Sequence, residues 1–267
     1  MTQNVGQLAG ASLAAIRRKQ PLIHNITNFV VMNNTANALL ACGASPVMAH
    51  AAEEVEQMVS FAGALVLNIG TLTPVWVDSM LLAASKAKEL GVPIVLDPVG
   101  SGATDLRTQA SLRILAVGVS LVRGNASEVL SLGDAASQTK GVDSTHSVDE
   151  AAQAGLELAR SLGTPVAITG AVDLITDGQR VLRVSNGHPM LTKVTGAGCT
   201  ASALIGAFLA VDPDPLTASA SALAFLGLAA EKAAAISNGP GSLQMNLLDA
   251  LYSLPPEALA REARTSA

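Results

Sequence analysis

The stretch of residues 191–209, LTKVTGAGCTASALIGAFL, decides how the rest of the chain is interpreted. Its residues 194–198 form a turn of mostly small residues, and an uncharged helix pattern follows from Cys199 or Thr200. Such a turn leaves several amide N–H groups unpaired at the positive end of the helix dipole. We therefore expect an anion site, with phosphate as its occupant. A plain glycine turn before a buried helix is the alternative for an isolated Gly-Ala-Gly, so the other residues must decide.

The composition favours a large buried core and disfavours a nucleic-acid partner. Of the 267 residues, 49% are apolar and only 14% are charged, which disfavours disorder. Aromatic residues make up 2%, so the core consists of Ala, Val, Leu and Ile, and stacking platforms for single-stranded nucleic acid are scarce. The 16 basic and 21 acidic residues give no basic footprint for a phosphate backbone.

The high mean hydropathy of +0.42 raises the question of a membrane protein. The most apolar runs, 201–211 and 218–230, are shorter than the roughly 20 residues of a spanning helix. Buried helices, some of them covered by a partner subunit, explain this composition better. The first residues show no secretory signal pattern, so we expect a cytoplasmic protein. Cys42 and Cys199 suggest neither a zinc site nor a disulfide framework, and Cys42 is expected to be a buried small hydrophobe.

Short apolar strands alternate with helix patterns along the chain. We expect strands at 21–27, 45–49, 64–70, 92–97, 120–123 and 165–169, and a hairpin at 173–178 and 180–184. Helices are expected at 5–18, 29–41, 53–61, 75–90, 106–115, 126–130, 148–162 and over most of the chain from 200, with a surface loop at 134–147. This order predicts an α/β fold with a mostly parallel sheet buried on both faces, in one domain spanning 1–267.

Polar residues and glycines gather where the expected strands end. Ligands in such folds lie outside the carboxyl ends of the strands. Those ends carry His24, Asn25 and Met48, and the segments 68–70, 97–100, 123–125 and 169–170. A crevice at this edge is therefore expected, with residues 196–199 joining it at the head of the next helix.

The segment RGNASE, residues 123–128, combines a cation with a possible metal site. Arg123 offers a permanent planar charge for phosphate. Asn125 and Glu128, three residues apart, suit water-mediated Mg²⁺. The same pair equally fits a capping box at a helix start, and the two roles are compatible.

Other strand-end residues also have two interpretations. Asp97 is either a carboxylate near metal or phosphate, or the start of an Asx turn. Thr169 and Gly170 either contact phosphate or end a strand. His24 either orients a substrate or is a buried histidine. The sequence holds neither a Gly-x-Ser-x-Gly elbow nor a standard P-loop, and its remaining histidines lack metal-ligand spacing.

Seven motifs, taken together and in order, resemble one family of enzymes. They are HNITN at 24–28, SPVM at 45–48, LNIG at 67–70, DPVG at 97–100, RGNASE at 123–128, TG at 169–170 and VTGAGC at 194–199. This set resembles the hydroxyethylthiazole kinases of the ribokinase-like superfamily over nearly the whole chain. The resemblance implies a three-layer α/β/α fold without a separate lid domain. It also implies transfer of the ATP γ-phosphoryl group, with Mg²⁺, to the hydroxyl of 4-methyl-5-(2-hydroxyethyl)thiazole for thiamine salvage, by a homotrimer with interfacial substrate sites.

The resemblance also assigns roles to matching positions. The thiazole would contact Met48 and Gly196, with Asn25, Asn68 and Gly70 nearby. ATP phosphates would contact Arg123, Thr169 and Gly170, and Asp97 and Glu128 would serve Mg²⁺. The amides of Gly196, Ala197, Gly198 and Cys199 would form the anion hole.

Cys199 stands where ribokinase-like enzymes generally carry an aspartate as base. A helix N-terminus lowers the pKa of a thiol, so a thiolate base is one possibility, although a nearby triphosphate opposes it. Phosphoryl transfer depends mainly on positioning and charge stabilisation, so a weak base can suffice.

Three other functions are compatible with parts of the sequence. The nearest is a kinase of the same fold acting on hydroxymethylpyrimidine or pyridoxal, which the cysteine and the SPVM motif disfavour. A non-catalytic binding regulator would not need Asp97, Arg123, Glu128 and Gly198 together. An acyl-transfer enzyme with Cys199 as nucleophile lacks a partner histidine other than His24.

Overall fold

A computed structural model describes residues 5–133 and 148–267. The alternating segments form one nine-stranded sheet of order β2-β1-β3-β4-β5-β6-β7-β8-β9. The strands from β2 to β6 in this order are parallel, and β7, β8 and β9 pair antiparallel. The strands are β1 (Leu22–Ile26), β2 (Ser45–Val47), β3 (Ala64–Asn68), β4 (Ile94–Asp97), β5 (Leu121–Asn125), β6 (Val166–Thr169), β7 (Asp173–Thr176), β8 (Val181–Val184) and β9 (Thr265–Ser266).

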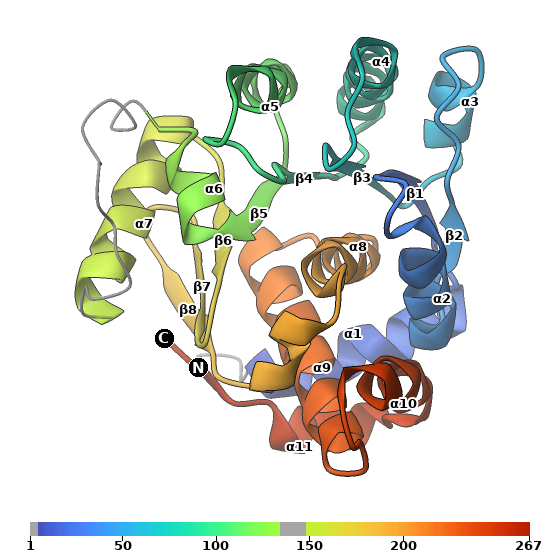
Figure 1. The fold of residues 1–267 in the computed structure, drawn as a ribbon, viewed down its shortest axis with the longest axis vertical. Coiled ribbons are helices and arrows are strands. Elements are labelled where there is room, and N and C mark those ends of the chain that lie inside the picture. Colours follow the sequence, from blue (N-terminus) through green and yellow to red (C-terminus); the bar gives the residue numbers. More distant parts are fainter. Residues whose placement is uncertain (1–4, 134–147) are drawn as a thin grey trace.

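Helices connect the strands and cover both faces of the sheet (Figure 1). They are α1 (Val5–Lys19), α2 (Met32–Cys42), α3 (Val55–Val59), α4 (Pro74–Leu90), α5 (Asp105–Val117), α6 (Ala126–Leu130), α7 (Val148–Leu162), α8 (Ala197–Leu209), α9 (Pro215–Ala234), α10 (Pro240–Ser253) and α11 (Pro256–Glu262), with a 3₁₀ helix at Pro189–Lys193. Among the described residues, no helix is both long and apolar enough to cross a membrane.

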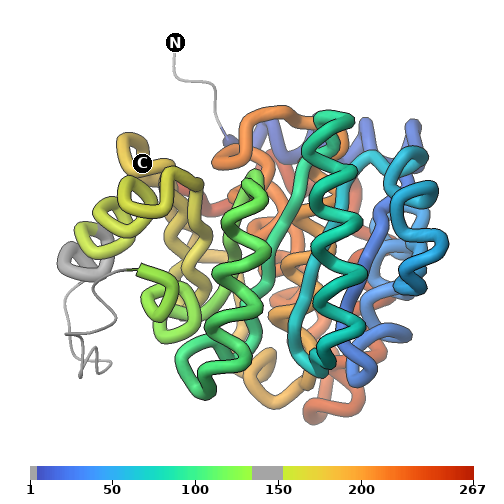
Figure 2. The backbone as a smooth tube through the Cα atoms, turned by 90° about the horizontal axis from the view of Figure 1, so that it is seen from above, coloured from blue at the N-terminus to red at the C-terminus, as the bar shows by residue number. Residues whose placement is uncertain are grey.

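The two-residue period of the strands divides the core between the faces of the sheet. In β3, Leu65 and Leu67 pack into the cluster beneath α3, α4, α5, α6 and α7, while Ala64 and Val66 pack into the cluster formed with α1, α2, α8, α9, α10 and α11. Figure 2 shows α4 and α5 side by side on the first of these faces. Both faces are buried, which explains the continuous apolar strands.

Helix α8 lies directly against the second face, and its small residues permit the close approach. A Cβ atom at Gly206 would lie 2.7 Å from the Cγ2 atom of Val66. On the outer side of α8, the rings of Phe208 and Phe225 meet with centroids 5.9 Å apart, which joins α8 to α9. The separation between α8 and the sheet is therefore set by glycine and alanine.

Two expected helix starts were wrong by a few residues. Helix α8 begins at Ala197 rather than at Cys199 or Thr200, because Gly196 adopts φ +81° and turns the chain into the helix earlier. Helix α2 begins at Met32 rather than Phe29, because residues 29–31 form a turn in which the amide of Val31 donates to the carbonyl of Asn28.

The structure also contains elements that the sequence patterns did not indicate. The short strand β9 pairs with β8, although a mostly helical C-terminal part was expected. The expected helix at 5–18 and hairpin at 173–184 are confirmed. The expected loop at 134–147 lies outside the described residues.

Candidate active site at the carboxyl edge of the sheet

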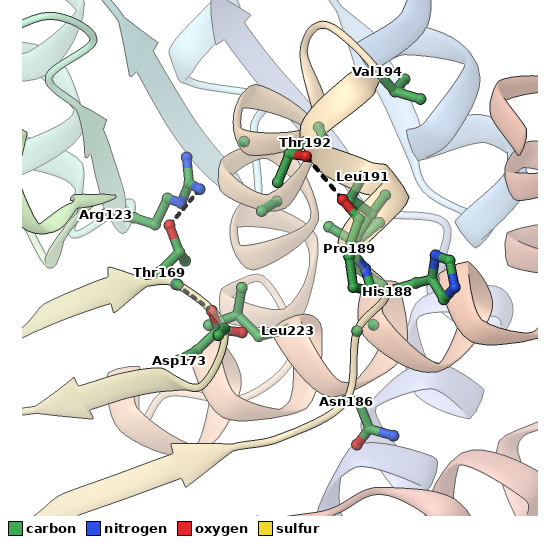
Figure 3. A pocket seen from close by; sticks show the side chains of 18 of the residues that line it. Arg123, Thr169, Asp173, Asn186, His188, Pro189, Leu191, Thr192, Val194 and Leu223 are labelled. Atoms are coloured by element: carbon green, nitrogen blue, oxygen red, sulfur yellow. Dashed lines mark hydrogen bonds between the residues drawn. The ribbon is translucent and has the colours of Figure 1, made fainter. Parts of the chain in front are cut away.

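A cavity of about 660 Å³ opens where β5 and β6 end (Figure 3). Its walls come from these strand ends, residues 186–194, and the first turns of α8 and part of α9. Six residues predicted for the site line it: Arg123, Thr169, Gly170, Gly196, Ala197 and Gly198. The position confirms the expectation of a crevice at the carboxyl edge of a mostly parallel sheet.

The first turn of α8 brings amides without an intrahelical acceptor to the edge of this cavity. The amide of Thr200 donates to the carbonyl of Gly196 at 2.8 Å, which closes the first turn of the helix. The amides of Ala197, Gly198 and Cys199 precede this bond and have no intrahelical acceptor. Together with the helix dipole, they favour an anion at this end of the cavity.

Arg123 brings a buried cation to the same wall. The residue is 8% exposed, and its Nη2 donates to Oγ1 of Thr169 at 2.6 Å. Its Nη1 lies 3.8 Å from Oδ2 of Asp97. A Cβ atom at Gly198 would lie 2.7 Å from Nη1, so the glycine is what lets the guanidinium meet the helix N-terminus. A phosphate in this corner would face the guanidinium and the amides together.

A buried polar network runs from β1 to α8 beside this corner. Asn28 donates to Oδ1 of Asn68 at 2.8 Å, and Asn68 donates to Oδ2 of Asp97 at 2.7 Å. The same oxygen of Asp97 accepts from Oγ of Ser202 at 2.8 Å. The predicted residues Asn68 and Asp97 are therefore brought together, and Asn28 and Ser202 each add a hydrogen bond to this pair.

Asp97 is an unusual carboxyl group within this network. Burial raises its pKa and Glu128 adds to the effect, while Arg123, Ser202 and Asn68 oppose it. Its Oδ1 atom is buried and has no hydrogen-bond partner among the described residues. Burial without full pairing is costly, so this oxygen is suited to a cation or donor supplied by a ligand.

Cys199 is a protonated thiol rather than a thiolate in this environment. Burial raises its pKa to about 11, and the negative charge of Asp97 adds to the effect. Its Sγ accepts a long hydrogen bond of 3.5 Å from Asn28. Burial and Asp97 therefore disfavour the thiolate base that was one possibility, although Asn68, Asn28 and Arg123 act in the opposite direction. A thiol this reluctant to ionise also disfavours the acyl-transfer alternative.

Glu128 forms the capping box that was one of its two interpretations. Its Oε2 accepts from the amide of Asn125 at 3.0 Å, and Oδ1 of Asn125 accepts from the amide of Glu128. Its Oε1 accepts from the amide of Gly100 at 2.9 Å, which ties α6 to the loop after Asp97. Each oxygen keeps a second lone pair, so the cap does not remove the possibility of a metal-bound water.

Met48 and Asn25 lie apart from the network. Asn25 is fully buried, and its Nδ2 donates to the carbonyl of Ile23, while its Oδ1 lacks a partner among the described residues. Met48 is half-buried on the loop after β2. His24 is also fully buried, and its Nε2 donates to the carbonyl of Ala49 at 2.7 Å, which anchors the loop carrying Met48. His24 is thus a buried structural histidine, whose pKa is lowered by burial.

Gly70 is required by close packing. A Cβ atom there would lie 2.7 Å from Nδ2 of Asn28, and its amide donates to Oδ1 of Asn68.

Arg107 is a site-adjacent cation that the sequence did not single out. Its guanidinium donates to the carbonyls of Ile69, Gly70 and Val99, and so joins the loops after β3 and β4. Nothing in its local sequence distinguishes it from Arg113, six residues later, which forms an exposed ion pair with Asp78. Its role depends on contacts between distant segments.

The family model described as the hydroxyethylthiazole kinase family matches residues 13–257. The chain belongs to this family. It is therefore a kinase, and the expected enzyme class is confirmed. A hydroxyethylthiazole kinase of Desulfotalea psychrophila is 59% identical over 98% of this chain and 96% of its own length.

Solved structures give the same result for the fold. The hydroxyethylthiazole kinase of Pyrococcus horikoshii OT3 superposes with a TM-score of 0.89 at 49% identity, over 97% of this kinase and 98% of that chain. A pyridoxal kinase of Bacillus subtilis in complex with ADP gives a TM-score of 0.57 at 20% identity, over 80% of this chain and 92% of that one, and so shares the fold alone. The predicted ribokinase-like α/β fold is confirmed.

Asp173 is a carboxyl group in the cavity wall, and its raised pKa predicts how the stability of the protein depends on pH. Burial raises its pKa from 3.8 to about 6, although the amide of Gly170 and the charge of Arg123 oppose the shift. The folded state therefore binds more protons than the unfolded state between about pH 4 and pH 6, and this group's contribution to stability falls as pH rises through that window. Asp173→Asn keeps an oxygen for Gly170, so we expect it to be more stable than the wild type above about pH 6, on the order of 1–3 kcal/mol, and equal near pH 4.

Urea unfolding at pH 4 and pH 7.5 measures this difference. Asp177→Asn is the control of opposite sign, because hydrogen bonds from Gln179 and Arg180 outweigh burial and lower the pKa of Asp177. That variant should be less stable than the wild type at pH 7.5. Asp173→Asn being destabilised at pH 7.5 would contradict the assignment.

Proposed function

We propose that this kinase transfers the γ-phosphoryl group of ATP, with Mg²⁺, to the hydroxyl of 4-methyl-5-(2-hydroxyethyl)thiazole. The product would be the thiazole monophosphate used in thiamine salvage, made by a single cytoplasmic domain spanning residues 1–267. The observation that carries the proposal is that Arg123 meets the first turn of α8, at Ala197 and Gly198, in one cavity wall. Relatives more than 50% identical over most of the chain are named hydroxyethylthiazole kinase, which supports the acceptor.

The cavity offers different chemistry for the two parts of a nucleotide. Its phosphate end consists of Arg123, Thr169, Gly170 and the α8 amides. Leu191, Leu223 and Leu226 add apolar surface to the lining, which suits a base. The transfer itself needs little covalent assistance, because its transition state is stabilised by alignment and by charge on the phosphoryl oxygens. The α8 amides supply that charge stabilisation as the phosphoryl group passes over them.

The acceptor would lie on the other side of the α8 turn. Met48 and Gly196 would contact the thiazole ring, with Asn25 and the Asn68 to Gly70 turn beside it. The bond from His24 to Ala49 fixes the loop of Met48, and Asn28 holds the Asn68 turn next to Cys199. The hydroxyl would then point toward the thiol and the first amides of α8.

Asp97 and Glu128 would serve the metal ion. They are close enough for the charge of Glu128 to raise the pKa of Asp97, and Oδ1 of Asp97 lacks a partner among the described residues, so the pair fits a divalent cation. Among the described residues, no group of three or more His, Cys, Asp or Glu side chains forms a metal cage. Mg²⁺ ordinarily uses only one or two carboxylates together with phosphate and water. A bound Mg²⁺ would supply positive charge against the phosphates of ATP.

The proposed function is tested by measuring ADP release with Mg²⁺ and a panel of alcohols. Hydroxyethylthiazole, hydroxymethylpyrimidine, pyridoxal and a sugar form the panel, and the phosphorylated product is identified by mass. We expect turnover to depend on the thiazole and to disappear with a chelator of divalent cations, because the Asp97 region then lacks its counter-charge. Turnover of pyridoxal or the pyrimidine alone would contradict the substrate, and thiazole binding without turnover would indicate a regulator.

Substitution of Cys199 tests whether position 199 acts through its side chain. Because the thiol is protonated, it contributes little as a base, and we expect Cys199→Ser to remain active. Cys199→Asp should keep or raise kcat, since a carboxylate accepts the hydroxyl proton better. Steady-state kinetics with both substrates varied gives the answer, and an inactive Cys199→Asp beside an active Cys199→Ser would exclude a base at this position.

The proposed homotrimer has a candidate contact surface beside the acceptor side. Phe29, Val30 and Val75 are 62%, 65% and 74% exposed. Phe29 packs edge-on against Trp76, and the ring of Trp76 also stacks on the ring of His50. Phe29 directly follows Asn28 of the polar network. A neighbouring subunit on this patch would shield it and close the acceptor site.

The oligomeric state is measured by sedimentation or light scattering. We expect about three times the chain mass of 27.0 kDa for the wild type. Phe29→Glu should lower this mass and reduce turnover together. Leu90→Glu, at the far end of α4, is the exposed-leucine control and should change neither. A monomeric wild type that is fully active would contradict the interfacial site.

A further inference from the structure

The wall of the cavity formed by Asn186 and Gly187 is held by residues far away in the sequence. This wall belongs to the segment of residues 185–188, which connects β8 to the 3₁₀ helix. Asn186, Gly187 and His188 line the cavity, and Figure 3 shows Asn186 and His188 away from the phosphate corner at Arg123. Gly187 has φ +152°, and no described atom would contact a Cβ placed on it. The local sequence therefore leaves the path of this segment loosely defined.

Glu231 of α9 holds the segment from one side. Its Oε1 accepts from the amide of Gly187 at 2.7 Å and from Nδ2 of Asn186 at 3.4 Å. One turn earlier on α9, the backbone of Asn186 is pressed against Gly227, where a Cβ atom would collide with the carbonyl of Asn186. The same helix contributes Leu223 and Leu226 to the cavity, so the segment and the apolar lining are fixed to one support.

Arg264 holds the segment from the other side. Its amide donates to Oδ1 of Asn186 at 2.6 Å, and its carbonyl accepts from the amide of Ser185 at 2.9 Å. Its guanidinium bonds both oxygens of Glu231 and the carbonyl of Ser185. The two parallel bonds of this pair fix the orientation of both side chains. Burial raises the pKa of Glu231, but the hydrogen bonds from Arg264 and from the amide of Gly187 lower it below its usual value, so Glu231 stays ionised.

The pair is better suited to setting geometry than to stabilising the fold. Arg264 and Glu231 are 54% and 24% exposed at their side chains, and ion pairs at such a surface contribute little to the free energy of unfolding. Yet they meet at the two residues that form this wall of the cavity. Arg264 also lies outside residues 13–257, the range that the family model matches.

We propose that Glu231 and Arg264 are positioning residues for the nucleotide, which hold Asn186 and Gly187 against the part of ATP beyond its phosphates. This inference rests on the proposed function, because it assumes that ATP binds in this cavity. The acceptor side is formed by other elements, so loosening the segment weakens binding of ATP and leaves binding of the thiazole alcohol unchanged. The chemical step, which depends on Arg123 and α8, proceeds at nearly the wild-type rate once ATP is bound.

The test compares Arg264→Met and Glu231→Gln with the wild type in kinetics and in direct nucleotide binding. We expect the KM for ATP and the Kd of a non-hydrolysable ATP analogue to rise about tenfold, with kcat and the KM for the thiazole alcohol within about twofold of the wild type. Arg264→Lys keeps the positive charge but cannot form the two parallel hydrogen bonds to Glu231, so its affinity for ATP should lie between those of Arg264→Met and the wild type. Arg261→Met is the matched control, because Arg261 pairs only with the side chain of Glu262 among the described residues, and it should change nothing.

Hydrogen exchange at the amides of residues 185–188 separates the possible results. Faster exchange in Arg264→Met with a raised KM for ATP supports the proposal. Faster exchange with an unchanged KM for ATP overturns the role in nucleotide positioning. Unchanged exchange would show that Glu231 and Arg264 do not hold residues 185–188 in place, and it overturns the proposal. An equal rise in both KM values would assign the pair a general structural role instead. A wild type that neither binds nor consumes ATP refutes the proposed function, and the nucleotide role with it, whatever the exchange rates show.

Discussion

The buried guanidinium of Arg123 is the constraint on which the site depends. A permanent charge at 8% exposure is strongly desolvated, and its nearest opposite charge, Asp97, stands at 3.8 Å. The positive end of α8 lies against the same group and adds positive potential to this corner. An anionic phosphate is the ligand that balances it. The desolvated charge of Arg123 costs free energy in the protein without ligand, and the same charge favours the binding of a phosphate.

Close packing by small residues makes this arrangement possible. Gly198 leaves room for the guanidinium at the first turn of α8, and Gly206 lets the same helix lie against Val66 of the sheet. A larger residue at either position would lift the helix from the strands or push the cation out of the corner. The many alanines and glycines around α8, which raise the mean hydropathy of the chain, are thus part of the geometry of the site.

Burial also determines how the acidic groups can act. Asp97, Asp173 and Cys199 all have raised pKa values, because each lies in a poorly hydrated edge of the sheet. A thiol with a pKa of about 11 cannot be a ready base. Under the proposed function, catalysis therefore depends mainly on alignment and on fixed positive charge, as phosphoryl transfer requires.

The sequence by itself determined the parallel sheet, the small-residue turn before α8 and the strand-end positions of Arg123, Thr169 and Asp97, because periodicity and turn residues act over short spans. Met48 and Asn25 stay predictions, since neither joins the network of the described residues. Only the tertiary structure decided the protonation of Cys199, since desolvation sums over neighbours from many segments. It also decided which groups Arg107, Glu231 and Arg264 contact. Their side chains reach backbone groups that are distant in sequence, and no local pattern encodes which carbonyls and amides the fold will bring within their reach.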